Sequence, residues 1–350
     1  MNDSLRPLFD HAGAAYDAGN AAEPLHFGNW RAEYDALSGA AGLVDFSRRT
    51  QIELSGADRQ SFLHNLCTNE VRRLAPGAGC EAFLCNAQGH TLALVNIFCG
   101  AETLVIETVP GEEGKLLAHL DRYLIREKVA LRGRSDDWAE LLLAGPAAAG
   151  LLQARSIAPP ERLWDHVVAP IAGVDTSIRR VDISHPGGFL VSCARSAVAA
   201  VWNALREGGA RPCGAQALEI ARLEAGTPEY GRDLTDANLP QEVARDARAI
   251  SFTKGCYIGQ ETVARLDALG HVNRTLCGVR FSGAEIPPVG TAFQDEAGKS
   301  LGLVTSAAFS PRCDAPLALA YVRRGSNTPG TRLMSPLGAA EVVALPIAAQ

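Results

Sequence analysis

The chain has 350 residues, more than a single hydrophobic core usually accommodates, so we expect two or three domains. Hydrophobic residues make up 47% and charged residues 21%, which excludes wholesale disorder, collagen and coiled coil. No apolar run approaches the roughly 20 residues that span a bilayer, and a net charge of −6 argues against broad nucleic-acid binding.

The first part of the chain predicts an α+β arrangement. An N-terminal extension over residues 1–30 is expected to form a short helix on the surface. A helix is then predicted from Ala32 to Leu37, and residues 50–56 alternate polar and apolar side chains as a half-buried strand does. The elements that follow are a helix including residues 62–66, strands at 82–85, 91–98 and 103–107, and an amphipathic helix at 112–125.

A similar plan recurs along the sequence. Residues 53–63 and 140–152 both predict a strand, a glycine turn and a helix, with the glycines at Gly56 and Gly145. Two related α+β units, over residues 31–135 and 136–274, would explain the recurrence. The alternative is that two turns of a common kind occur independently.

The composition changes beyond Arg274. After a predicted helix at 214–225, the tail carries short β-type runs separated by Pro and Gly turns, which is typical of a small β-barrel or sandwich. We therefore expect a separate β domain over residues 275–350. Its predicted strands lie at 276–281, 301–305, 317–322 and 340–345.

Cysteine usage and the N-terminus indicate a cytoplasmic protein. The nine cysteines are odd in number and include no CxxC pair, so neither a disulfide framework nor an all-cysteine zinc site is expected. The histidines show no ligand spacing, and we expect no metal site. No basic segment followed by an apolar one opens the chain, so no secretory signal is expected, and no membrane partner either.

The densest chemistry lies in the octapeptide Lys254–Glu261, KGCYIGQE. Two glycines flank Cys256, and a lysine two residues before it, expected to be exposed, can favour the thiolate, which acts as nucleophile or metal ligand. The side chains of Gln260 and Glu261 can form a hydrogen-bond network behind it. The alternative is a glycine-rich turn whose cysteine only packs.

A second candidate is the segment RLEAG, which contains Arg222 and Glu224. A carboxylate near the end of an apolar helix can accept two parallel hydrogen bonds from an amidine-like edge, such as that of a pterin. The alternative is an ion pair between these two residues. Nearby basic residues could instead attract a folate tail, a phosphate or an acidic partner, or form a solvated face: Arg245, Arg248, Lys254, Arg265, His271 and Arg274.

The octapeptide, with TVAR after it and GHVNR at 270–274, resembles the signature of the YgfZ-type folate-binding proteins, which are related to the glycine cleavage T-protein, an aminomethyltransferase. The segments 33–46, 52–58, 62–66 and 120–129 are similar to the T-protein domain. The resemblance implies an α+β fold of three domains around a central folate opening, with a C-terminal β-barrel.

The resemblance also implies residue roles. Glu224 matches the glutamate that holds the pterin, and Cys256 matches the signature cysteine, so we expect Cys256 and Lys254 to be catalytic. The residues expected to bind tetrahydrofolate, or a one-carbon derivative of it, are Glu224, Arg222, Tyr230, Tyr257, Gln260 and Glu261.

One departure bears on the reaction. Where the T-protein has an aspartate pair, this chain has Ala93 and Leu94, which cannot exchange a proton or stabilise a cationic transition state. The resemblance therefore implies a folate-binding protein that supports iron–sulfur clusters in client enzymes, such as those of tRNA modification. Its partners would be cluster carriers or clients. The alternatives are an aminomethyl or other one-carbon transferase and a non-catalytic scaffold.

Overall fold

The computed structural model describes residues 5–17, 19, 21–184, 187–295 and 298–348. The chain forms two compact units. Unit 1 comprises the described residues of Met1–Leu66, Glu70–Ala82 and Val95–Ala221, and unit 2 those of Cys67–Asn69, Phe83–Leu94 and Arg222–Gln350. The division into residues 1–30, 31–135, 136–274 and 275–350 remains a prediction.

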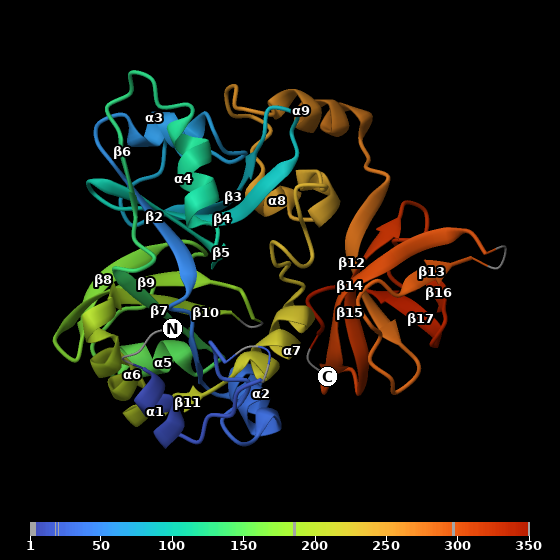
Figure 1. The fold of residues 1–350 in the computed structure, drawn as a ribbon, viewed down its shortest axis with the longest axis horizontal. Helices are drawn as coiled ribbons and strands as arrows, with labels where there is room; N and C mark the ends of the chain where they lie inside the picture. The colour runs from blue at the N-terminus through green and yellow to red at the C-terminus, as the bar shows by residue number, and fades with distance from the viewer. Residues whose placement is uncertain (1–4, 18, 20, 185–186, 296–297, 349–350) are drawn as a thin grey trace. The chain divides into compact units, whose positions relative to one another are not determined.

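Unit 1 is built on two largely antiparallel sheets, drawn from blue to yellow-green in Figure 1. In the first sheet the order is β3 (Gly79–Cys85), β4 (Thr91–Cys99), β5 (Thr103–Pro110), β2 (Arg49–Ser55) and β6 (Ala130–Gly133). The end of β3 from Phe83 and the start of β4 up to Leu94 belong to unit 2. In the second the order is β11 (Arg211–Pro212), β1 (Gly42–Asp45), β7 (Trp138–Ala144), β10 (Gly188–Ala194), β9 (Val174–Val181) and β8 (His166–Ile171).

Six helices of unit 1 accompany these sheets: α1 (Arg6–His11), α2 (Trp30–Gly39), α3 (Arg59–His64), α4 (Glu113–Asp121), α5 (Ala148–Gln153) and α6 (Val198–Glu207). The first lies where a short helix packed on the surface was expected: Leu5 and Phe9 are buried, and the Phe9 ring centroid lies 5.0 Å from that of Trp202. Burial of large apolar side chains holds this short helix on the core, since six residues form a stable helix only with tertiary packing.

The helix expected at 112–125 ends early. Leu116 and Leu120 are buried on α4, whereas Ile125 is 87% exposed. Beyond Asp121 the backbone continues in turns, because no buried contact rewards a further helical turn there. The apolar residues beyond Leu120, which suggested the longer helix, therefore do not form a buried helical face.

The two glycine turns of the proposed repeat have the same backbone geometry. Gly56 follows β2 and Gly145 follows β7, and each has φ +107°. A Cβ on either would collide with a backbone carbonyl, that of Lys128 for Gly56 and that of Ala40 for Gly145. Only glycine tolerates both the conformation and the close approach. This shared geometry supports the repeat at the level of the two turns.

Unit 2 ends in the expected β domain, which is a closed six-stranded barrel, orange to red in Figure 1. Its strands, in order around the barrel, are β12 (Arg274–Phe281), β15 (Ala315–Arg323), β14 (Ser300–Ser310), β13 (Ala292–Gln294), β16 (Arg332–Ser335) and β17 (Gly338–Val343). All four predicted strands are present. The short strands β13 and β16 were not predicted, because neither contains an apolar run.

The strand β15 explains how the barrel joins the rest of unit 2. Ala318, Ala320 and Val322 pack inside the barrel, whereas Leu317 and Leu319 pack in a second cluster outside it. Alternate residues of a strand point to opposite faces, so β15 is buried on both faces. The second cluster also contains Leu223 of the RLEAG segment and Tyr257 of the octapeptide, together with Leu234 and Val263.

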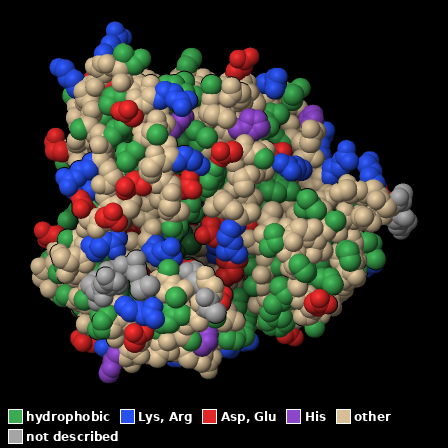
Figure 2. All heavy atoms as spheres, viewed as in Figure 1, with side chains coloured by type: hydrophobic (Ala, Val, Ile, Leu, Met, Phe, Trp, Pro, Cys, Tyr) green, Lys and Arg blue, Asp and Glu red, His purple; other side chains and the backbone are tan. Residues whose placement is uncertain are grey.

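The α+β fold class with a C-terminal barrel is thus confirmed. None of the described helices is long and apolar enough to cross a membrane. On the face drawn in Figure 2, blue basic and red acidic side chains are interspersed, and that face carries no broad basic surface.

Candidate functional site

The octapeptide precedes and begins α9 (Gln260–Leu269) in unit 2. Gly259 stands at the N-cap with φ +81°, and a Cβ on it would lie 2.5 Å from the carbonyl oxygen of Asn86. Thr262 donates from Oγ1 to the carbonyl of Gln88 over 2.8 Å. The structure therefore joins the octapeptide to the turn before Ala93 and Leu94.

Neither side chain at these two positions can take part in acid–base chemistry. Ala93 is fully buried, and Leu94 is half-buried against the apolar cluster of unit 2. Their side chains have no polar atom, so neither can donate or accept a proton. Within the described residues, no group of three His, Cys, Asp or Glu side chains could hold a metal ion either.

The sequence predicted that Lys254 is exposed to solvent, and this prediction is wrong. Its side chain is buried, with the residue only 7% exposed, and Nζ donates to the carbonyls of Cys67 and Asn69 over 2.7 and 2.8 Å. The ammonium also lies 4.8 Å from the ring centroid of Tyr257. Two carbonyls and an aromatic face compensate its desolvation, so Lys254 fastens residues 67–69 to the octapeptide.

Cys256 is the exposed one of the nine cysteines, as expected. Cys277 and Cys313 are half-buried, and the other six are buried. Burial raises the pKa of the Cys85 thiol to about 12 and that of Cys277 to about 11, which keeps both protonated at neutral pH. The thiol that a reagent or partner reaches first is therefore in the octapeptide.

The residues behind Cys256 divide between the interior and the surface. Tyr257 is buried in the apolar cluster, and this burial raises the pKa of its phenol. Gln260 accepts a hydrogen bond from the backbone N–H of Tyr257 over 3.3 Å, while Glu261 is exposed in the first turn of α9. The expected hydrogen-bond network is thus partly a support for the local backbone.

The helix α7 (Ala215–Ala225) carries Glu224 and Arg222 in its last turn. Glu224 is 2% exposed; its Oε1 accepts from the Ser310 hydroxyl over 2.5 Å, and its Oε2 lies 3.6 Å from Arg312 Nε. The buried carboxylate is therefore oriented by the end of β14 and the turn after it.

Arg222 has a different partner. Its Nη1 donates to Asp233 over 2.6 Å and to the carbonyl of Thr227 over 2.8 Å. Asp233 also accepts from the hydroxyls of Thr305 and Ser306, each over 2.6 Å. A buried arginine held in this way supports the loop after α7, and a folate contact would have to compete with the aspartate.

Tyr230 lies in that loop, where it packs on the apolar cluster and its hydroxyl donates to Asp236. The six basic residues proposed as a local patch are not one surface. Arg274 pairs with Glu242 over 3.0 Å, Arg245 and Lys254 are buried, and Arg248, Arg265 and His271 are exposed.

Three residues of these contacts, Asp233, Ser310 and Arg312, were not predicted from the sequence. Asp233 follows Tyr230-Gly231 closely, and this acid near Arg222 in the sequence is a signal from which an ion pair could be predicted. Ser310 is separated from Glu224 by 86 positions, and nothing in its local sequence points to that partner.

Two family models cover nearly the whole chain. Residues 8–254 match the model described as the GCVT N-terminal domain. Residues 274–347 match the glycine cleavage T-protein C-terminal barrel domain, the segment that forms the closed barrel here.

The chain belongs to the glycine cleavage T-protein family.

Curated relatives in this family carry the name aminomethyltransferase. The protein from Geobacillus kaustophilus is 30% identical over 319 residues, covering 86% of this chain and 84% of that protein. The Bacillus subtilis protein is 28% identical over 338 residues, covering 93% and 92%. A crystal structure of glycine cleavage system aminomethyltransferase T from Bartonella henselae has a TM-score of 0.90 at 22% identity, covering 99% of this chain and 98% of that one, and so shares the T-protein fold.

Proposed function

We propose that the protein binds tetrahydrofolate, or a one-carbon derivative of it, and carries out folate-dependent one-carbon transfer. Membership of the T-protein family and relatives named aminomethyltransferase support this proposal. The observation that carries it is the buried carboxylate of Glu224 at the end of α7, in the segment that resembles the folate pocket of the T-protein.

Glu224 is suited to a pterin. An ionised carboxylate offers about four acceptor positions, of which the Ser310 hydroxyl occupies one. The guanidinium of Arg312 lies 3.6 Å from Oε2 and forms an ion pair with this carboxylate. A carboxylate can accept in parallel from the N–H and the amino group of a pterin edge, and charge-assisted pairs of this kind are among the stronger hydrogen bonds in proteins.

Titration calorimetry with tetrahydrofolate tests the binding step. Glu224→Gln should weaken binding by about 1.5–3 kcal/mol, the usual effect of losing a hydrogen bond to a charged group. Glu285→Gln, made on an exposed glutamate, is the matched control and should bind as the wild type does. Thermal unfolding of both variants checks that they fold. A wild-type protein that gives no heat at high ligand concentration would rule the proposal out.

The transfer step is constrained by Ala93 and Leu94. Because neither side chain can act as an acid or base, an aminomethyl transfer in this protein would have to take its proton elsewhere. Single-turnover assays with methylene-tetrahydrofolate and candidate amines distinguish transfer from binding alone. A transferase converts the bound folate within one turnover, whereas unchanged folate would reject the transfer step.

A second candidate function is support of iron–sulfur cluster assembly in client enzymes. The observation in its favour is Cys256, an exposed thiol in an octapeptide resembling the YgfZ signature. Capture of cluster carriers or clients by the wild-type protein, but not by Cys256→Ser, would support this function. A deletion strain whose cluster enzymes remained fully active would reject it.

A further inference from the structure

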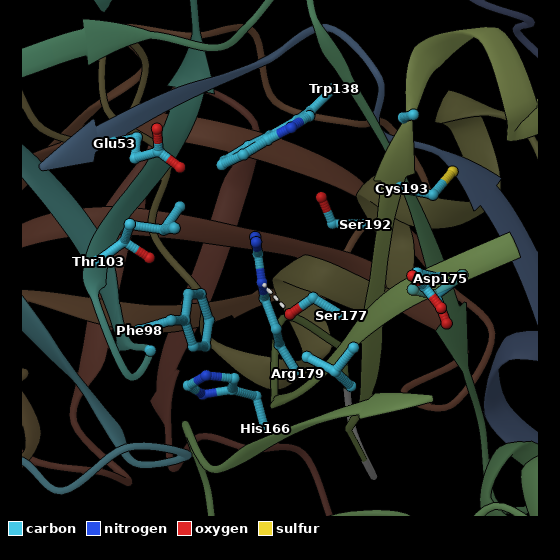
Figure 3. Close-up of a pocket in the computed structure, with 15 residues that line it drawn as sticks. Glu53, Phe98, Thr103, Trp138, His166, Asp175, Ser177, Arg179, Ser192 and Cys193 are labelled. Atoms are coloured by element: carbon cyan, nitrogen blue, oxygen red, sulfur yellow. Dashed lines mark hydrogen bonds between the residues drawn. The ribbon is translucent and has the colours of Figure 1, made fainter. Parts of the chain in front are cut away.

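A cavity of about 280 Å³ lies in unit 1, and none of the candidate folate-binding or octapeptide residues lines it. Strands of both sheets of unit 1 form its wall (Figure 3). This wall is mainly apolar and includes three flat side chains, Phe98, Trp138 and His166. The size is close to the lower limit of the cavities that hold small ligands.

Arg179 occupies the middle of this cavity, between Phe98 and Trp138 in Figure 3. The residue is 3% exposed, and its guanidinium carbon lies 4.9 Å from the ring centroid of Phe98. Nε donates to the Ser177 hydroxyl over 3.1 Å, and Nη1 donates to Glu140 over 2.8 Å and to Gln51 over 3.2 Å. These contacts fix the plane of the guanidinium before any ligand arrives.

The other terminal nitrogen of Arg179 has a different status. None of the described residues accepts a hydrogen bond from Nη2. Burial and the neighbouring Glu107 raise the pKa of Glu140, so this carboxyl compensates the charge of Arg179 less fully than an exposed carboxylate would. Arg179 therefore keeps donor capacity and positive charge for an anion.

Three other titratable groups on the wall do not prevent an anion from binding beside Arg179. His166 is neutral at pH 7, since burial and then Arg179 lower its pKa to about 4, and its Nδ1 has no partner. Glu53 is paired with Arg134 over 2.7 Å. Asp175 stands across the cavity from Glu53 in Figure 3, where its charge limits an anion to the Arg179 side.

We propose that this cavity binds a small aromatic carboxylate. The carboxylate accepts from Arg179 Nη2, and the ring packs against the flat walls that Phe98 and Trp138 provide. A carboxylate that accepts from Nη2 forms a charge-assisted hydrogen bond, and an aromatic ring matches an apolar wall with flat faces. This binding goes beyond the folate function proposed above and uses none of its residues.

Calorimetric titration with benzoate tests the proposal, with benzamide as the uncharged probe of the same shape. Benzoate should bind, and benzamide should bind at least about tenfold more weakly because it lacks the charge. Ala194, an exposed residue on the cavity wall, allows a blocking variant that leaves Arg179 in place. Ala194→Trp should abolish benzoate binding, and Ala194→Ser, which leaves the space open, should preserve it.

A second variant addresses the charge directly. Arg179→Gln should weaken benzoate binding at least about tenfold, with folding checked by thermal unfolding. The proposal fails if the wild type does not bind benzoate in the millimolar range, or if benzamide binds equally well. It also fails if Ala194→Trp leaves binding unchanged. If tetrahydrofolate displaced benzoate, the cavity would belong to the folate site. The proposal of a separate carboxylate site would then be wrong.

Discussion

Gly259 and Gly89 lie so close in unit 2 that a Cβ atom on Gly259 would stand 2.9 Å from the Cα atom of Gly89. The octapeptide and the Asn86–Gly89 turn are therefore packed backbone to backbone, and each determines where the other lies. This contact explains why a glycine is needed before α9. It also brings the exposed Cys256 segment and the strand that carries Ala93 into the same part of unit 2.

Gly259→Ala should destabilise the protein. A methyl group would collide with the carbonyl of Asn86, and φ +81° is a conformation that side-chain-bearing residues rarely adopt. We expect a loss of about 1–3 kcal/mol in the free energy of unfolding, measured by urea denaturation. Gly255→Ala is the matched control, because nothing lies within 4 Å of the place that its methyl group would take, and it should change stability by less than about 0.5 kcal/mol. Equal effects at both glycines would contradict the packing argument.

Lys254→Met should also destabilise the protein, contrary to what an exposed lysine would do. The carbonyls of Cys67 and Asn69 would lose the lysine donor, and removing one partner from buried polar groups costs about 1–3 kcal/mol. The free energy of unfolding from urea denaturation measures this loss. Lys299→Met, on an exposed lysine of the barrel, should have an effect below about 0.5 kcal/mol. If the two variants were equally stable, the carbonyl contacts would contribute nothing.

Cys256 should be the first thiol to react with an alkylating reagent. A brief treatment near neutral pH, followed by peptide mass spectrometry, should label Cys256 before the half-buried Cys277 and Cys313. The six buried cysteines should react only on unfolding, since the reagent cannot reach them. Cys256→Ser should remove the rapid phase and leave the slower ones unchanged. Faster labelling of Cys313 or Cys67 would show that the octapeptide thiol is not the accessible one.

The stability of the protein should depend on pH through His166. The folded-state pKa is lowered from 6.5 to about 4, so the unfolded chain binds more protons between these values. The free energy of unfolding should therefore rise as the pH rises from about 4 to 6.5, and the contribution is complete above 6.5. His166→Gln should flatten this part of the profile, measured by urea denaturation at a series of pH values. An unchanged slope in the variant would assign the dependence to other groups.

The sequence by itself determined the α+β class, the barrel tail and the accessible cysteine. Alternation of apolar residues and Pro or Gly turns act over a few positions, so β12, β14, β15 and β17 could be predicted from local patterns. The sequence also predicted an exposed thiol at Cys256, from the flanking glycines, the nearby Lys254 and the adjacent hydrogen-bonding side chains, although the lysine itself is buried.

Only the tertiary structure decided which polar groups meet. Lys254 finds its acceptor on Cys67 187 positions away, Glu224 finds Ser310 86 positions away, and Arg179 reaches Gln51 128 positions away. No local pattern encodes such pairs, because a buried polar group takes whichever partner the packed chain brings within hydrogen-bond distance. For the same reason the cavity around Arg179 could not be predicted, since its wall is assembled from strands of two sheets.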